Sequence, residues 1–391
     1  MTGHYWLTMF ALLAAATTAT AQTGPTPPVV DVGLGRGVTI RAADDSASLN
    51  IRARIQVRST LVDNPDDMTD MSEISIRRAR LIFQGIAAGP SLTYYVQLSF
   101  ANLDNEADLR LPLRDAYITW AGNRDVNVRV GQMKVPFSRQ RVVSSSALQM
   151  VDRSIVVSEL NLDRDVGIQV FSRDLFGVGK LGYAVGLFGG EGRNRLGRTP
   201  GFLYTARLEA WPLGPFDDLV EGDLRRSEHP RLAVGASVGY NQNTNRPRST
   251  IGTPYVAGDF DYTHAAADVV LKWRGWSVTS EIIYRRADSP TRALATTMAA
   301  SSIVARPGWG TYLQSGFMVS PRIEVTGRYS LLQPLLDNAD LSFVSGREFS
   351  AGLSYYVQGH DLKIQGDISD VENRMAGGHT RQARVQFQLF F

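Results

Sequence analysis

The sequence contains no cysteine, which excludes disulfide bonds, thiolate catalysis and cysteine-ligated metal sites. Lysine is also scarce, with four among the 41 basic residues, and the five histidines form no pair at the spacing typical of metal ligands. No later stretch approaches the roughly 18 consecutive apolar residues of a transmembrane helix, and no amphipathic pattern exceeds two helical turns. We therefore expect no metal, no cofactor and a fold rich in strands.

The first residues have the pattern of an export signal. Residues 6–16 form an apolar run, and Ala19 and Ala21 follow as a small-residue cleavage site before Gln22. Residues 1–21 are therefore predicted to be a signal peptide, and the mature protein is expected outside the cytoplasm.

The segment from Leu49 to Arg58 alternates apolar and polar residues, which is the period of a β-strand. Its polar face carries three arginines. The last residues of the chain, 383–391, repeat the alternation with apolar residues at the odd positions. A sequence that ends inside such a strand is expected when a sheet closes on itself.

Sixteen segments of 10 to 14 residues show this alternation, and transmembrane strands need roughly 9 to 11 residues. An even number of strands is typical of outer-membrane barrels. The predicted strands are residues 47–60, 73–86, 91–102, 112–121, 125–134, 163–173, 180–190, 200–211, 230–241, 261–274, 276–287, 309–320, 321–333, 345–358, 360–372 and 379–391.

The connections between these segments alternate between short turns and long loops, with residues 211–230 as a long exception on the short side. Outer-membrane barrels place short turns in the periplasm and long loops outside the cell. A soluble β-sandwich also alternates, but the export signal, strand count and loop asymmetry favour an all-β, 16-stranded antiparallel transmembrane β-barrel over residues 47–391. Residues 22–46, with glycines at 33, 35 and 37, are expected to be a flexible periplasmic lead.

If the apolar faces meet lipid, the polar faces line the lumen. Arginines then concentrate on one stretch of wall in which no acidic side chain is expected, whereas the signs are mixed elsewhere. Arginine-lined pores select anions, although an unselective polar lining remains the alternative. The predicted anion-binding residues of the lumen are Arg52, Arg54, Arg58, Arg78, Arg80 and Arg384.

The longest connection, residues 134–162, is too apolar to extend into water, and long loops of this kind are often functional. We expect it to fold into the lumen as a constriction loop. The basic residues that it would carry towards the wall arginines are Lys134, Arg139, Arg141 and Arg153.

The chain also resembles the phosphate-selective porin O and P family. The resemblance is carried by residues 131–138 (GQMKVPFS), 150–154 (MVDRS), 164–169 (RDVGIQ) and 77–80 (RRAR), and by the terminal phenylalanine. It implies a trimeric porin of the bacterial outer membrane, surrounded by lipid and lipopolysaccharide, whose third extracellular loop folds into the channel. It also implies passive transport of phosphate or other small anions, and this location excludes a nucleic-acid partner.

Two alternatives remain open, a general porin and an outer-membrane barrel enzyme. A G-x-S-x-G motif contains Ser237, but it lies within an alternating strand and lacks the helix that a nucleophile elbow requires. No enzyme activity is therefore expected. Acidic clusters in the first long loops, including Asp104 and Glu106, are expected to be solvated.

Overall fold

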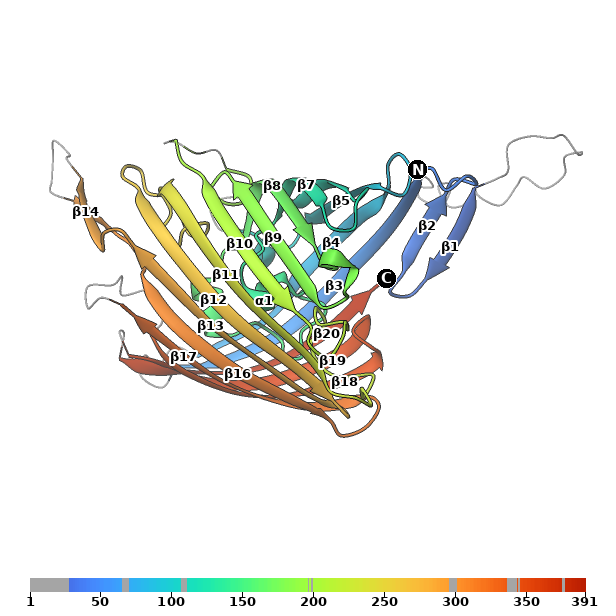
Figure 1. The fold of residues 1–391 in the computed structure, drawn as a ribbon. Helices are drawn as coiled ribbons and strands as arrows, with labels where there is room; N and C mark the ends of the chain where they lie inside the picture. The colour runs from blue at the N-terminus through green and yellow to red at the C-terminus, as the bar shows by residue number, and fades with distance from the viewer. Residues whose placement is uncertain are drawn as a thin grey trace, which may run out of the picture.

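The computed structural model describes residues 28–391 except 65–69, 107–110, 196, 198–199, 295–300, 336–342, 344 and 375–376. The predicted signal peptide lies outside the described residues. Within the described part, sixteen antiparallel strands form a closed barrel (Figure 1). The barrel strands are β3 (Ser48–Asp63), β4 (Met71–Ile86), β5 (Leu92–Ser99), β6 (Leu113–Trp120), β7 (Asn127–Lys134), β8 (Arg164–Ser172), β9 (Leu181–Phe188), β10 (Leu203–Ala210), β11 (Arg231–Thr244), β12 (Phe260–Trp273), β13 (Trp276–Ala287), β16 (Gly308–Met318), β17 (Ile323–Pro334), β18 (Gly346–Gln358), β19 (Leu362–Asn373) and β20 (Gly378–Phe390).

Each of the sixteen predicted segments forms one of these strands, so the predicted fold class is confirmed. The barrel closes between its first and last strands, because β20 pairs antiparallel with β3 from Arg381↔Asp63 to Phe390↔Arg54. Closure leaves no free edge among the sixteen strands, which is what a sheet in lipid requires.

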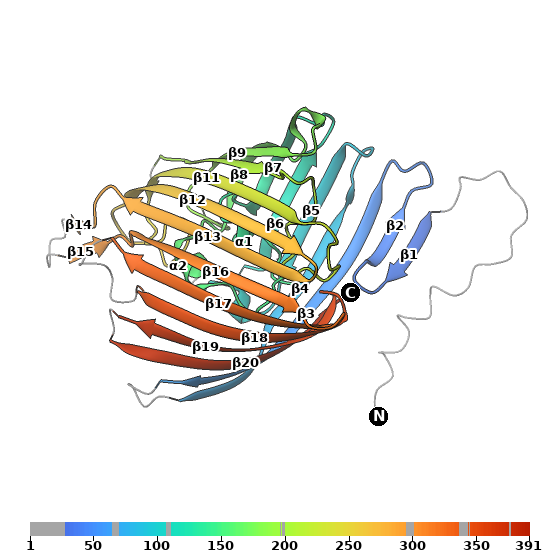
Figure 2. The same ribbon diagram turned by 60° about the horizontal axis from the view of Figure 1, so that its bottom comes forward.

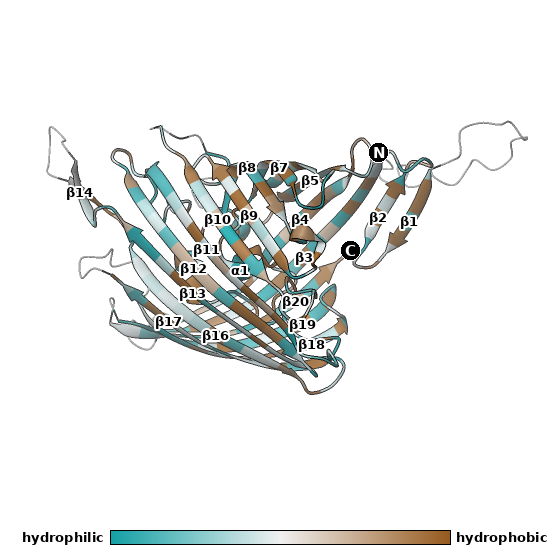
Figure 3. Cartoon of the chain, viewed as in Figure 1, coloured by the Kyte–Doolittle hydropathy of each residue, from teal (hydrophilic) through white to brown (hydrophobic). Residues whose placement is uncertain are grey.

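Burial alternates along the strands as the sequence predicts. In β12 the side chains alternate between buried and more exposed along the whole strand. Apolar residues dominate the exposed set, including Leu313 at 53% and Ile368 at 63%. Brown and teal residues accordingly alternate along the strands (Figure 3). The apolar outer face suits lipid, and the polar face points into the barrel.

One end of the barrel carries the short turns. The tightest joins β12 to β13 through Arg274 and Gly275, whose φ angles are 49° and 90°. Two successive residues with positive φ form the turn that matches the twist of a β-hairpin. This end is the periplasmic one in outer-membrane barrels.

The flexible lead expected before the barrel contains a hairpin, so that expectation is wrong for residues 29–41. Strands β1 (Val29–Gly33) and β2 (Gly37–Arg41) pair antiparallel, and β2 continues onto the first residues of β3. The hairpin lies beyond the barrel rim, beside the C-terminus (Figure 2). Gly35 and Gly37 adopt φ angles of 73° and 70°, which explains the glycine-rich turn.

The remaining regular elements are short. Two helices lie in the connection after β7, and no helix of the described residues is long and apolar enough to span a membrane. These elements are η1 (Asn102–Asp104), α1 (Arg139–Val142), α2 (Ile155–Leu160), η2 (Leu175–Gly177), and the separate hairpin of β14 (Thr291–Leu294) and β15 (Ser301–Val304).

Candidate functional site

The predicted wall arginines lie on the lumen side of β3, β4 and β20. Arg58 and Arg80 are 6% and 7% exposed, whereas Ile55 on the opposite face is 47% exposed. Barrel closure brings Arg384 of β20 to the same patch, because it lies within 3.4 Å of the Asp152 carboxylate that also pairs with Arg58. The sequence therefore located these side chains on the correct face.

The expectation that no acid enters this patch is wrong, because loops supply carboxylates that strand alternation cannot place. Asp152 accepts a 2.6 Å bond from Arg58 Nη1. Asp104 accepts bonds of 2.6 and 2.7 Å from Nε and Nη2 of Arg80, and Arg114 Nη1 lies 3.3 Å from its Oδ1. The Asp104 side chain is 5% exposed, so the expectation of a solvated residue is also wrong.

Asp104 is held in its ionised form by this arrangement. Burial opposes ionisation, but the positive charges of Arg80 and Arg114 outweigh it and hold the pKa of Asp104 well below its usual range. The carboxylate is therefore a permanent negative charge against the arginine wall at neutral pH.

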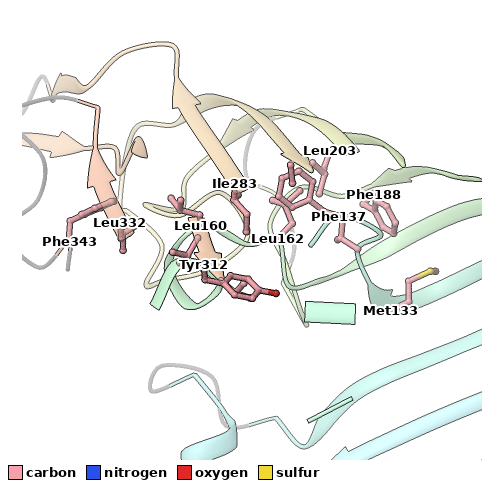
Figure 4. Packing of buried hydrophobic residues seen from close by; sticks show 14 residues of the cluster. Met133, Phe137, Leu160, Leu162, Phe188, Leu203, Ile283, Tyr312, Leu332 and Phe343 are labelled. Carbon is pink, nitrogen blue, oxygen red and sulfur yellow. The ribbon is translucent and has the colours of Figure 1, made fainter. Parts of the chain in front are cut away.

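Residues 135–163, here called the inserted loop, make an apolar contact with the barrel interior. Phe137, Val156, Leu160 and Leu162 are fully buried against side chains from β9, β10, β13, β16 and β17 (Figure 4). Complete burial of each such side chain contributes roughly 1.5–3 kcal/mol. Contacts with strands from several parts of the wall fix the loop inside the ring of strands.

Arg139 anchors the inserted loop through carboxylates. Its guanidinium pairs with Asp268 on β12, with Asp218 and, at 3.3 Å, with Glu209 on β10. Ser237, the serine of the G-x-S-x-G motif, lies in β11 and donates a 2.7 Å bond to a carbonyl of the same loop. Both side chains hold the loop to the wall.

Two other basic residues of the predicted constriction loop form hydrogen bonds with the inserted loop itself. Lys134 Nζ donates to the Val142 and Val143 carbonyls at 2.6 and 3.2 Å, and Arg141 Nε donates to Asp163 at 2.7 Å. These bonds close the loop on itself at the point where it leaves and rejoins the wall.

Arg153 differs from these residues in its partners. Its Nε and Nη2 donate to the carbonyls of Gln140 and Val143, at 2.8 and 2.7 Å. Burial lowers the pKa of Arg153 to about 9, so the guanidinium remains charged at neutral pH. Its charge is not cancelled by a carboxylate at ion-pair distance among the described residues.

The unusually long connection on the short-turn side, residues 211–230, also enters the barrel; we call it the periplasmic insert. The backbone amide of Glu221 donates to the Ala147 carbonyl of the inserted loop at 2.9 Å. The Glu221 carboxylate accepts from Gln140 Nε2, Gln149 N and Gln314 Nε2 at 2.9 to 3.1 Å. Two segments that start from opposite ends of the barrel therefore meet inside it.

A cavity of about 1310 Å³ remains beside these segments. Its described lining has fourteen basic side chains and seven carboxylates, so positive charge is in excess. Of the predicted residues, the lining includes Arg78, Arg80, Arg384, Lys134, Arg141 and Arg153.

The other predicted residues are not part of this lining. Arg52 donates to the Gly35 carbonyl at 2.5 Å and stacks on Phe390 at 3.9 Å, so it joins the N-terminal hairpin to the barrel. Arg54 donates to Ser144 of the inserted loop, and Arg58 is held by Asp152. That any of the predicted residues binds an anion stays a prediction.

Two arginines beside Asp104 escaped the sequence reasoning because β-bulges displace them. Gln97 pairs with Asp115 and Leu98 with Leu113, which leaves Arg114 as the extra residue of β6. The pairing of β3 with β4 skips Arg77 in the same way. A bulge redirects a side chain that strict alternation would place on the other face. A signal was available, because strict alternation places both arginines on the lipid-facing side of their strands.

Several known proteins are similar to this chain in sequence or in structure. An uncharacterized protein of Aquifex aeolicus (strain VF5) is 23% identical over 391 residues, covering 90% of this chain and 89% of its own. The Salmonella typhi OmpF structure in complex with daunomycin is 13% identical, with a TM-score of 0.58 over 89% of this chain and 99% of its own. The anion-selective porin from Comamonas acidovorans is 11% identical, with a TM-score of 0.57 over 88% of this chain and all of its own.

These structural similarities concern the fold, and they agree with the barrel described above. The sequence itself matches a family model over nearly its whole length. Residues 49–391 match the model described as phosphate-selective porin O and P, and the match runs from the first barrel strand to the last residue. The chain therefore belongs to the phosphate-selective porin O and P family and is a channel protein of the bacterial outer membrane.

Proposed function

We propose that this porin lets small anions, and phosphate or other oxyanions in particular, diffuse passively through its lumen. The observation that carries the proposal is the cavity lining, where basic side chains outnumber carboxylates two to one among the described residues. The family description points to the same class of solute. A homotrimer in lipid and lipopolysaccharide is the assembly that we propose from the family.

Several weak sites suit passive transport better than one tight site, because an anion must also leave. Most wall arginines share their charge with a carboxylate, as Arg80 does with Asp104 and Arg384 with Asp367 at 2.7 Å. Partial neutralisation weakens each site while the excess charge still repels cations. Because the cavity is walled by protein, these charges act more strongly than they would in bulk water.

The test is the reversal potential of the purified trimer or monomer in a planar lipid bilayer under a potassium chloride gradient, repeated with phosphate on one side. We expect a potential of the sign that anion permeation gives, and a chloride current that phosphate inhibits at millimolar concentration or below. A cation-type potential, or a chloride current indifferent to phosphate, would leave a general porin. No conductance at all would reopen the barrel-enzyme alternative.

A further inference from the structure

The three-residue turn η1 (Asn102–Asp104) accepts hydrogen bonds from arginines of two strands, β4 and β6. Each of the two bulged residues reaches it, since Arg77 Nη1 donates to the Leu103 carbonyl and Arg114 Nη1 to the Asp104 carbonyl. Two β-bulges therefore direct arginine side chains at the same turn. Bulges are common next to functional sites, where they re-aim a side chain.

The Asp104 carboxylate occupies a site with the geometry of an oxyanion receptor. Nε and Nη2 of Arg80 contact its two oxygens in parallel, and Ser99 Oγ donates to Oδ2 at 2.6 Å. Arg114 Nη1 and Arg78 Nε lie 3.3 and 3.7 Å from Oδ1. A planar fork on two oxygens is the way in which arginine binds a carboxylate.

The site holds more donors than one carboxylate uses. Arg78 and Arg114 are 4% and 5% exposed, and their Nε atoms have no hydrogen-bond partner among the described residues. A buried guanidinium donor without a partner is costly. Both side chains line the 1310 Å³ cavity, so these donors lie next to the space that an anion would enter.

The turn itself is held by polar bonds far more than by apolar contacts. Leu103, the apolar residue of η1, is 49% exposed, so the turn buries no large apolar side chain. The N-cap residue, Ala101, offers no side-chain bond to the turn. A free carboxylate could replace the Asp104 bonds at little loss of hydrophobic burial.

We propose that Asp104 is a tethered counter-ion, which occupies the oxyanion site of Arg78, Arg80 and Arg114 and is displaced by a permeating anion that carries a carboxylate. The inference rests on the proposed anion channel and adds a site, a ligand geometry and a control element to it. The tethered Asp104 lowers the apparent affinity of the site for a free ligand. A free ligand can bind only during the fraction of time in which Asp104 has left the site.

Inhibition of the chloride current by a free carboxylate tests the proposal directly. Acetate, which is the free equivalent of the Asp104 side chain, serves as the probe, and its half-inhibitory concentration for chloride current is measured in planar bilayers. We expect Asp104→Asn to lower that concentration by about tenfold, since the competitor is removed. The gain should disappear in Asp104→Asn/Arg114→Gln and persist in Asp104→Asn/Arg129→Gln, because Arg129 borders the same cavity but stacks on Tyr117 at 4.4 Å.

A matched chemical pair tests the tether. Asp104→Cys alkylated with iodoacetate regains a tethered carboxylate and should return to the weak inhibition of the wild type. The same protein alkylated with iodoacetamide gains a neutral group of similar size and should keep the strong inhibition. The proposal is overturned if the two adducts behave alike, if Asp104→Asn shifts acetate inhibition by less than about twofold, or if Arg129→Gln abolishes the gain as Arg114→Gln does. The wild-type reversal potential tests the anion channel separately.

Discussion

The backbone amide of Glu221 donates a 2.9 Å hydrogen bond to the carbonyl of Ala147, and this bond joins the periplasmic insert to the inserted loop inside the barrel. Apolar contacts accompany it, since Leu219 and Val220 pack against Val143 and Leu148. The two segments therefore meet inside the lumen and narrow it together.

Removal of the Glu221 carboxylate should loosen this junction. Glu221→Ala leaves three donors without their acceptor, those of Gln140, Gln149 and Gln314. A buried donor that loses its partner costs about 1–3 kcal/mol. We expect higher and noisier single-channel conductance in planar bilayers. Asp217→Ala removes an exposed charge from the same insert and should leave the conductance unchanged. Equal traces for the two variants would contradict a joint constriction.

Arg153 offers the cleanest test of charge in the lumen. Its guanidinium borders the cavity and bonds backbone carbonyls, so Arg153→Gln removes a positive charge without stranding a carboxylate. We expect the anion-to-cation permeability ratio, taken from reversal potentials, to fall on the order of twofold. Arg322→Gln, on an exposed turn, should not change it. An unaltered ratio in Arg153→Gln would separate this residue from ion selection.

Phe137 should hold the inserted loop in place through burial. It is fully buried, and Phe→Ala in such a site costs about 3–5 kcal/mol. We expect Phe137→Ala to keep its barrel but to become cleavable by trypsin after Arg141 or Arg153, as read by mass spectrometry of the nicked protein. Phe349→Ala, on the lipid face and 58% exposed in the wild type, should resist cleavage like the wild type. A trypsin-resistant Phe137→Ala would assign the anchoring to the ion pairs of Arg139 instead.

The sequence predicted the strands of the barrel wall well and the loops inside the barrel poorly, and the difference has a physical reason. Strand alternation is a local, two-residue signal that lipid and lumen enforce along each strand, so Ile55 outside and Arg54 inside follow directly. Loop placement depends on contacts between distant residues, such as Arg58 with Asp152 and Gln149 with Glu221. No local pattern encodes those pairs.

Bulges set the second limit of sequence reasoning. One extra residue reverses the face of the side chains that follow, and neither Arg77 nor Arg114 stands in a sequence that marks it as extra. The N-terminal hairpin of β1 and β2 was missed for a simpler reason. Its alternation around Val30 and Val38 is only a few residues long, and its glycines suggested flexibility, although they form its turn.

The pH dependence of stability should expose the ion pairs that close the inserted loop. Asp163 accepts from Arg141 Nε at 2.7 Å and Arg164 Nη1 at 3.0 Å. Burial opposes its ionisation, but the charges of Arg141 and Arg164 outweigh burial and hold the pKa of Asp163 well below its usual range. A lowered folded-state pKa means that the contribution of Asp163 is complete above the unfolded value of about 3.9 and is lost as pH falls through the folded value.

We therefore expect Asp163→Asn to lower the free energy of unfolding by about 2 kcal/mol at pH 7. The difference from the wild type should persist at pH 5 and shrink only in strong acid, where the wild-type carboxylate also becomes neutral. Urea unfolding in detergent micelles, followed by the mobility shift of the folded barrel on gels, measures it. Asp217→Asn, an exposed carboxylate, is the control. A difference that vanished already between pH 7 and pH 5 would mean that the Asp163 pKa is raised, and that Arg141 and Arg164 do not hold its charge.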